Sequence, residues 1–459
     1  MNTRQRFADK LADPELRRKM AVSMGTSLAH RLERMAEAPE WEELRDAAHD
    51  LRQYTLAHLG ELLTQAETNL TARGVRVFWA EDAAAANQYI IDTARRLGVQ
   101  KVVKGKTMTS EETCLNDALR AAGLQPVETD LGEYLVQLSG ERPTHITAPA
   151  VHMSRQDCGR LICAELDQPY TDDPRELTLM VREVLRPEFI RSQLGVSGGN
   201  FLVADTGTLV ICDNEGNQGL VTALCDVHVA LVGIDKIVPR LQDLAPLLRL
   251  LARNSTGQTL TGYTTLISGP RRETDVDGPR ELHLILLDNG RTKMLADPTA
   301  RDGLTCIRCG VCCGICPIYF KVGGHPYWTY PGATGAVWAP FISDEEWVEE
   351  LPHVCSLCGV CAEACPVKNS LSRALLQLRT RPQGRRRFPL TQRLGLPALG
   401  RLLDSPVLYR LAGRLMRLGW PFRKLVERAG PLGGWTQSRE LPTPGPRTFQ
   451  ETWRGNRRE

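Results

Sequence analysis

Apolar side chains recur every three or four positions along residues 1–70, between long charged stretches, for example at Leu51, Leu59 and Leu62. This spacing is typical of amphipathic helices and predicts a helical N-terminal region. From residue 71 the pattern changes to short runs rich in β-branched and apolar residues, as expected of buried strands. These runs lie at 75–80, 101–105, 145–149, 200–205, 208–212, 228–233 and 282–287.

Helical patterns separate several of these runs. The clearest cover residues 83–98 and 110–123. The second has Ser110 as a candidate N-cap and Gly123 just past its end. Strands that alternate with helices predict an α/β domain with a largely parallel sheet, which we place at residues 71–300.

The chain then becomes rich in cysteine. The pattern C-x₂-C-x₂-C-x₃-C-P occurs twice, as CIRCGVCCGICP at 306–317 and CSLCGVCAEACP at 355–366. This is the bacterial ferredoxin spacing, in which three cysteines of each run hold one four-iron cluster and the fourth holds the other. We therefore predict a helical, dicluster ferredoxin-like domain at residues 301–370 with two 4Fe–4S clusters. The predicted ligands are Cys306, Cys309, Cys312 and Cys365 for cluster 1, and Cys316, Cys355, Cys358 and Cys361 for cluster 2.

Three questions about this region have alternative answers. Zinc is disfavoured because four-cysteine zinc sites usually show two separated C-x₂₋₄-C pairs. Cys313 lies out of phase with the ligands and is either a spare thiol packed near the cluster, which we favour, or a substitute ligand. The 38 residues between Cys316 and Cys355 contain many glycines, prolines and aromatics. They form a lid, a docking surface or an ordered structural loop.

Composition favours a cytoplasmic, reducing environment. The start of the chain lacks the apolar segment of a secretory signal, and no apolar stretch approaches the length of a membrane span. Fourteen cysteines, eight of them in the two runs, are read as metal ligands and packed thiols rather than as a disulfide framework.

The near-neutral net charge hides an asymmetry. Residues 371–459 contain 19 Lys and Arg against 5 Asp and Glu, a formal charge of +14, so the rest of the chain carries −11. Leucines interspersed with arginines predict mostly helical, amphipathic structure in this basic C-terminal region. It either folds back on the acidic body, or binds an acidic partner or the anionic inner face of the membrane. Nucleic acid is the weakest option, since GRRRF at 384–388 is a single short run.

Two parts of the α/β domain have the composition of an anion site. Lys104 and Lys106 follow a strand and precede a helix, where open α/β sheets usually bind ligands. Glycine-rich turns can present backbone N–H groups to an anion. The candidate residues are Lys104, Lys106, Gly198, Gly199, Thr206 and Gly207. Ordinary turns with solvated lysines are the alternative. No dinucleotide-binding or P-loop motif is present in the sequence.

The order of motifs resembles one known family. The passages VVKGKTMTSEETCLNDALRAAG, GVSGGNFLVADTGTLVICDNEGN, HVALVGIDKIVP and STGQTLTGYTTLISGPRR, together with the double cysteine motif, look like the lactate utilization protein B family. This resemblance implies an α/β domain related in fold to sugar-phosphate isomerases and CoA transferases. Asp205 departs from the glutamate of the family pattern, and the position of Cys355 is not always cysteine in the family.

The resemblance also implies a function. The chain would be an electron-carrying subunit in the oxidation of L-lactate to pyruvate, with a cysteine-rich-domain subunit and a smaller lactate-utilization-domain subunit as partners. Two hypotheses of other classes stay open. The α/β domain itself could bind and oxidise a 2-hydroxy acid through Lys104 or Lys106, or the chain could be a redox sensor. No catalytic residue is assigned from the sequence.

Overall fold

The computed structural model describes residues 1–381, 390–422, 436, 440–445, 447–449 and 452–453. Residues 1–381 form one compact unit and residues 382–459 a second. The first unit begins with the predicted helical region. Its helices are α1 (Thr3–Leu11), α2 (Pro14–Ala36), α3 (Trp41–Ala57) and α4 (Leu59–Ala72).

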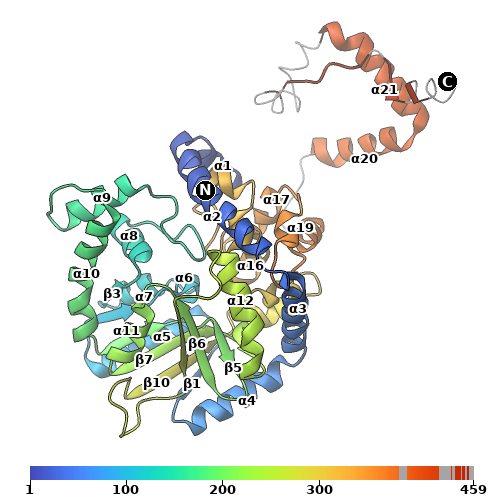
Figure 1. Cartoon of the computed structure of the whole chain (residues 1–459). Coiled ribbons are helices and arrows are strands. Elements are labelled where there is room, and N and C mark those ends of the chain that lie inside the picture. The colour runs from blue at the N-terminus through green and yellow to red at the C-terminus, as the bar shows by residue number, and fades with distance from the viewer. Residues whose placement is uncertain (382–389, 423–435, 437–439, 446, 450–451, 454–459) are drawn as a thin grey trace. The chain divides into compact units, whose positions relative to one another are not determined.

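A six-stranded parallel sheet lies at the centre of the first unit, as the alternating pattern predicts. Its order is β1 (Arg76–Ala80), β10 (Glu281–Leu287), β7 (Val227–Gly233), β4 (Leu194–Ser197), β2 (Lys101–Lys104) and β3 (Gln125–Glu128). Helices α9 and α10 flank one end of the sheet, and α3 and α4 lie toward the other (Figure 1). All neighbouring strands are parallel, so their carboxyl ends share one edge.

Both faces of the sheet are buried, which explains why its strands read as continuous apolar runs. Along β7, Val229 and Leu231 pack with α5 and α7 on one face, while Ala230 and Val232 pack with α4 on the other. The helices of this region are α5 (Ala83–Leu97), α6 (Met108–Glu112), α7 (Leu115–Ala121), α8 (Leu131–Ser139), α9 (Arg155–Glu165), α10 (Pro174–Arg191), α11 (Asn217–Leu224), α12 (Leu244–Ser255) and α13 (Arg291–Ala296).

A second, four-stranded sheet covers part of the first. Its order is β8 (Ile237–Val238), β5 (Phe201–Val203), β6 (Thr208–Asp213) and β9 (Tyr263–Ile267). Strands β5 and β6 form an antiparallel hairpin whose turn contains Thr206 and Gly207. Leu202 and Leu209 of this hairpin join the same apolar cluster as α4.

Two local predictions were wrong. Residues 145–149 form a loop rather than a strand, because the ring of His145 accepts hydrogen bonds from the N–H groups of Thr147 and Ala148, which turns the chain back on itself. The helix predicted at 110–123 is broken at Cys114, whose φ is +51°. Its first part is capped by Thr107 instead of Ser110, since the Thr107 side chain accepts from the N–H of residue 109.

The cysteine-rich region is built from short helices. They are α14 (Val311–Gly314), α15 (Tyr319–Val322), α16 (Gly332–Ile342), α17 (Leu351–Val354), α18 (Val360–Glu363) and α19 (Leu371–Thr380). Short 3₁₀ helices also occur in the first unit. In the α/β domain they are η1 (Ile234–Lys236) and η2 (Leu241–Asp243), and after it they are η3 (Arg301–Thr305) and η4 (Glu346–Glu350). Leu371 and Leu375 of α19 lie in the same core cluster as Trp338 of α16, so the compact unit runs past residue 370 to Arg381.

The segment between the two cysteine runs is an ordered part of this core. Helix α16 is buried almost throughout, and Trp338 is completely buried. The chain approaches itself so closely that a Cβ on Gly335 would lie 1.5 Å from the carbonyl oxygen of Tyr330. This packing supports the interpretation of the segment as a structural loop.

The second unit contains α20 (Leu390–Asp404), α21 (Pro406–Gly419) and η5 (Trp420–Phe422). None of the α21 side chains is buried, and its leucines at 408, 411, 415 and 418 recur at helical spacing between arginines. GRRRF at 384–388 lies outside the described residues. Within the parts of the chain that the structure describes, no helix combines the length and apolar composition that crossing a membrane requires.

Candidate iron–sulfur centre and adjoining cavities

The two cysteine runs fold in the same way. Arg308 and Leu357, which follow the first cysteine of each run by two positions, both have positive φ, at +62° and +56°. Their N–H groups donate to Cys306 Sγ at 3.4 Å and to Cys355 Sγ at 3.3 Å. Positive φ recurs at the glycine before each short helix, Gly310 and Gly359. The duplication in sequence is therefore also a duplication of a sulfur-binding backbone.

The structure gathers the thiols of both runs. Cys316, Cys355, Cys358 and Cys361 line one small apolar cavity, which includes residues from both runs. Burial, and then the neighbouring thiolate of Cys312, raise the pKa of Cys361 to about 12. Cys312 thus neighbours this set as well as its own run.

The other set surrounds Cys309. Burial raises the pKa of the Cys309 thiol well above its ordinary value, and the thiolates of Cys306, Cys365 and Cys312 raise it further. Each thiolate of this set makes ionisation of the other thiols less favourable. A cationic iron–sulfur core offsets that repulsion, so the four thiols are a suitable donor set for a cluster. The residues present therefore fit thiolate-bound iron–sulfur clusters.

Cys313 is packed into the surrounding protein. It is completely buried and its thiol donates to the carbonyl oxygen of Pro331 at 3.2 Å. Burial and this hydrogen bond favour a packing thiol over a substitute ligand.

Arg52 of α3 joins the α/β domain to the first cysteine run. Its guanidinium, 1% exposed, donates to the carbonyl oxygens of Asp235 at 2.5 Å and Ile237 at 2.8 Å, just after β7. It also donates to the carbonyl oxygens of Leu304 at 3.0 Å and Thr305 at 3.2 Å, just before Cys306. The N-terminal helices thus fix the cysteine loop to the edge of the sheet.

A cavity of about 360 Å³ opens where β2, β4 and β7 end, and we name it the strand-end cavity. Lys106, Gly198 and Gly199 line it together with Lys236 and Arg308. Burial and the neighbouring Arg308 lower the pKa of Lys236 to about 7. The cavity therefore combines the carboxyl edge of the sheet with the loop between two of the candidate cluster ligands, Cys306 and Cys309.

The other three residues of the predicted anion site lie elsewhere. Lys104 is still inside β2 and completely buried, with its Nζ 2.7 Å from Glu128 Oε1 and 3.0 Å from Asn116 Oδ1. Thr206 and Gly207 lie at the far end of the β5–β6 hairpin, where a Cβ on Gly207 would be 2.8 Å from the backbone nitrogen of Leu70. The structure thus brings together only half of the six predicted residues.

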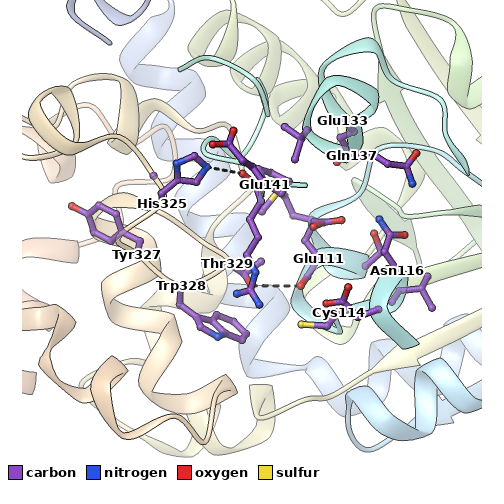
Figure 2. A pocket seen from close by; sticks show the side chains of 18 of the residues that line it. Glu111, Cys114, Asn116, Glu133, Gln137, Glu141, His325, Tyr327, Trp328 and Thr329 are labelled. Atoms are coloured by element: carbon purple, nitrogen blue, oxygen red, sulfur yellow. Dashed lines mark hydrogen bonds between the residues drawn. The ribbon is translucent and has the colours of Figure 1, made fainter. Parts of the chain in front are cut away.

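A second cavity, of about 450 Å³, is lined by acidic side chains (Figure 2). Glu111, Asn116 and Glu133 of successive helices line one side, and His325 and Trp328 of the segment between the cysteine runs line the other. Burial, and then the nearby carboxylate of Glu128, raise the pKa of Glu133 well above its ordinary value. Arg6, Arg120 and Arg142 also line this cavity, so it carries charges of both signs.

Reasoning from the sequence missed Lys236 and Arg308. Lys236 could have been found, because it follows the strand predicted at 228–233 much as Lys104 and Lys106 follow theirs. Arg308 gave no such signal, since only the folded chain brings the cysteine loop to the sheet edge.

A parallel α/β domain joined to a duplicated cysteine loop of this geometry defines an iron–sulfur protein with an attached α/β domain. Comparisons with known proteins agree and are more specific. Residues 63–287 match the model of the LUD domain, and residues 303–369 match that of the 4Fe-4S dicluster domain. The chain belongs to the lactate utilization protein B family.

Curated relatives align over nearly the whole chain. Lactate utilization protein B of Bacillus cytotoxicus is 37% identical, and the alignment covers 99% of this chain and 97% of the relative. The protein of the same name from Shouchella clausii is 39% identical over 92% of this chain and 90% of its own. A solved structure of a duf162 family protein from Deinococcus radiodurans covers 50% of this chain and 98% of its own at 15% identity. Its TM-score of 0.27 is too low to support a structural argument.

Proposed function

We propose that this chain is an iron–sulfur electron-transfer subunit in the oxidation of L-lactate to pyruvate. The gathering of eight thiols into two sets carries the proposal, in a chain whose relatives are named for lactate utilization. Cys306, Cys309, Cys312 and Cys365 would hold one 4Fe–4S cluster, and Cys316, Cys355, Cys358 and Cys361 the other. When bound, each cluster would pass one electron at a time, so the pair suits the two electrons that lactate releases.

The surrounding residues would tune and protect this relay. The N–H groups of Arg308 and Leu357 donate to ligand sulfur atoms, which favours the reduced, more negative state. Ile307 and Val311 are buried beside the first set and exclude water. The parallel sheet also supports the proposed relation in fold to sugar-phosphate isomerases and CoA transferases.

Lactate-dependent reduction is expected to require partner subunits. We expect the anaerobically cluster-loaded chain to keep its visible absorption when given L-lactate alone. We expect that absorption to bleach once the cysteine-rich-domain and smaller lactate-utilization-domain subunits are added. Bleaching of the chain without partners would contradict the relay and favour the second candidate function, oxidation of the 2-hydroxy acid by the α/β domain. The strand-end cavity is the observation that favours this second candidate.

The basic C-terminal region is proposed to bind the anionic inner face of the cytoplasmic membrane or an acidic partner. We expect the full chain, but not a chain ending at Arg381, to float with vesicles that contain phosphatidylglycerol, since each Lys or Arg near an anionic surface contributes about 1 kcal/mol. Both forms should carry the same iron, because α19 stays in the compact unit. Vesicles of phosphatidylcholine alone are the control. Equal flotation of both forms would leave the C-terminal region without this role.

A further inference from the structure

We infer that the strand-end cavity binds the carboxylate group of a small 2-hydroxy or 2-oxo acid between Lys236 and Arg308. The anion site follows from the geometry alone. The choice of these acids among small anions rests on the proposed function.

Two buried cations in this cavity lack acceptors. Lys236 is 7% exposed and Arg308 is 8% exposed. Among the described residues, neither Nη1 nor Nη2 of Arg308 has a hydrogen-bond acceptor, and the ammonium of Lys236 has neither an ion pair nor a hydrogen bond. The nearest carboxylate oxygen to Arg308, Asp235 Oδ2, is 3.6 Å from Nη2, beyond hydrogen-bond length. A buried ammonium without an ion pair and a buried guanidinium without a hydrogen-bond acceptor are both costly, so these two groups point to a bound anion.

The acidic side chains nearby each have at least one oxygen engaged, although Asp235 Oδ2 and Asp213 Oδ2 have no hydrogen-bond donor among the described residues. Asp235 Oδ1 accepts from Arg291 Nε at 2.5 Å, and Asp130 pairs with Lys106 at 2.8 Å. Of the acids that line the cavity, Asp213 accepts from the N–H of Gly216 at 2.6 Å, and Glu215 is exposed and 3.9 Å from Lys106. Lys106 is therefore paired with a carboxylate, whereas among the described residues Lys236 has no carboxylate within ion-pair distance and Arg308 has only the 3.6 Å pair with Asp235 Oδ2.

The shape of the site suits a carboxylate. The guanidinium of Arg308 lies 3.8 Å from the ring centroid of Trp338 and 4.7 Å from that of Tyr330, which fixes its plane. A fixed planar fork matches the two oxygens of a carboxylate. The close approach of the strand ends depends on glycine, since a Cβ on Gly198 would lie 2.2 Å from Thr107 Oγ1. Ligands of open α/β sheets bind at this edge.

The position of the site beside the cysteines has a functional consequence. Arg308 stands between Cys306 and Cys309 in the first run. Lys236 and Arg308 line the cavity, whereas none of the eight predicted cysteine ligands does. The two cations are therefore accessible to a ligand in the cavity as well as close to the cysteine loop. An acid held by Arg308 would contact the loop that holds the first cluster, on the side toward the sheet.

Binding can be measured without turnover. We expect pyruvate, and more weakly inorganic phosphate, to bind the cluster-loaded full chain saturably in equilibrium dialysis. Lys236→Met should weaken pyruvate binding by about tenfold or more, because a charged partner is lost. Iron content should be unchanged. Lys293→Met, on an exposed lysine, is the matched control and should bind as the unaltered chain does.

Two further measurements separate a ligand site from a structural role. Lys236→Met should unfold at a higher temperature than the unaltered chain, because it removes a buried charge that has no partner. Pyruvate should alter the electron paramagnetic resonance spectrum of the dithionite-reduced chain, but not that of Lys236→Met. If Lys236→Met does not fold, Arg308→Lys keeps the charge, removes the fork and should also weaken binding.

Several results would overturn the inference. They are the absence of saturable pyruvate or L-lactate binding, equal binding by Lys236→Met and the unaltered chain, and phosphate binding tighter than that of either acid. If the binding tests fail but L-lactate still reduces the clusters in the presence of partners, the proposed site is wrong and the proposed function stands. Binding without any reduction in the presence of partners would remove the proposed function and leave the site.

Discussion

Replacing Cys309 with serine is expected to lower the iron content of the chain from about eight to about four atoms, because a serine hydroxyl is a poor substitute for a thiolate ligand. Cys309 is buried among Cys306, Cys312 and Cys365, so no solvent ligand is positioned to replace it. Iron and acid-labile sulfide analysis of the anaerobically purified protein checks the loss. Lactate-dependent reduction in the presence of partners should fall to background, since the relay would be broken.

Cys313→Ser is the matched control. Cys313 is equally buried and lies four positions along the same run, but its thiol donates to Pro331. We expect this variant to keep about eight iron atoms. The opposite result, with iron lost from Cys313→Ser and retained in Cys309→Ser, would make Cys313 the ligand. Stoichiometric zinc in the unaltered chain would contradict both assignments.

The crossed assignment of the fourth cysteines can be tested in the same way. Cys365→Ser should leave the same electron paramagnetic resonance signal as Cys309→Ser, although the two residues lie in different runs. Cys316→Ser should leave the other signal. Identical residual signals for Cys309→Ser and Cys316→Ser would show that each run holds its own cluster.

The candidate ligands could be predicted because cluster binding depends on the spacing of cysteines within a short stretch of sequence. Each run needs three cysteines on one tight loop, and the positive φ at Gly310 and Gly359 serves that loop directly. The parallel sheet could also be predicted, since strands buried on both faces leave continuous apolar runs. Strands β4 (194–197) and β3 (125–128) were not predicted, because each is only four residues long and contains a glycine or a proline.

The strand-end cavity could be predicted only in part, for a physical reason. Lys106 and Lys236 each follow a strand, so the position of their backbone could be inferred from topology. The direction of Lys104 could not, because its ammonium is attracted into the protein by Glu128, a residue on another strand. Arg308 reaches the cavity only because Arg52 fastens the cysteine loop to the chain after β7. Such contacts depend on the complete tertiary fold.

One buried ion-pair network supports both the cavity and the cysteine loop. Arg291 of α13, 1% exposed, pairs with Glu112 at 2.8 Å and with Asp235 at 2.5 Å. Glu112 also accepts a hydrogen bond from the hydroxyl of Tyr330 at 2.7 Å. Since Tyr330 lies under Arg308 and Asp235 precedes Lys236, a change at Arg291 affects the whole wall of the cavity.

Arg291→Met is therefore expected to destabilise the chain by about 3–5 kcal/mol at neutral pH, because it leaves Glu112 and Asp235 buried without their main partner. The urea midpoint of the cluster-loaded protein, measured anaerobically, checks this loss. Arg95→Met is the surface control. Among the described residues, Arg95 makes only an exposed pair with Asp92 at 3.7 Å, so its loss should cost less than about 0.5 kcal/mol.

The effect of Arg291→Met should also depend on pH in a direction that identifies its cause. Burial alone would raise the pKa of Glu112, but the pair with Arg291 outweighs burial and holds the pKa below its ordinary value. In the unaltered chain this pair thus stabilises above the unfolded pKa of about 4, and the stabilisation is lost as pH falls. Without Arg291, burial should raise the pKa of Glu112 and favour its protonation, so the variant should lose less stability at pH 6 than at pH 8.

The double variant Glu112→Gln with Arg291→Met completes the test. Glutamine removes the buried charge and keeps an acceptor for Tyr330, so the double variant should recover part of the lost stability at pH 8 and show a weaker pH dependence than Arg291→Met. A loss that is equal at both pH values, and unchanged in the double variant, would mean that packing of the Arg291 side chain against Trp338, not the ion pair, holds this wall.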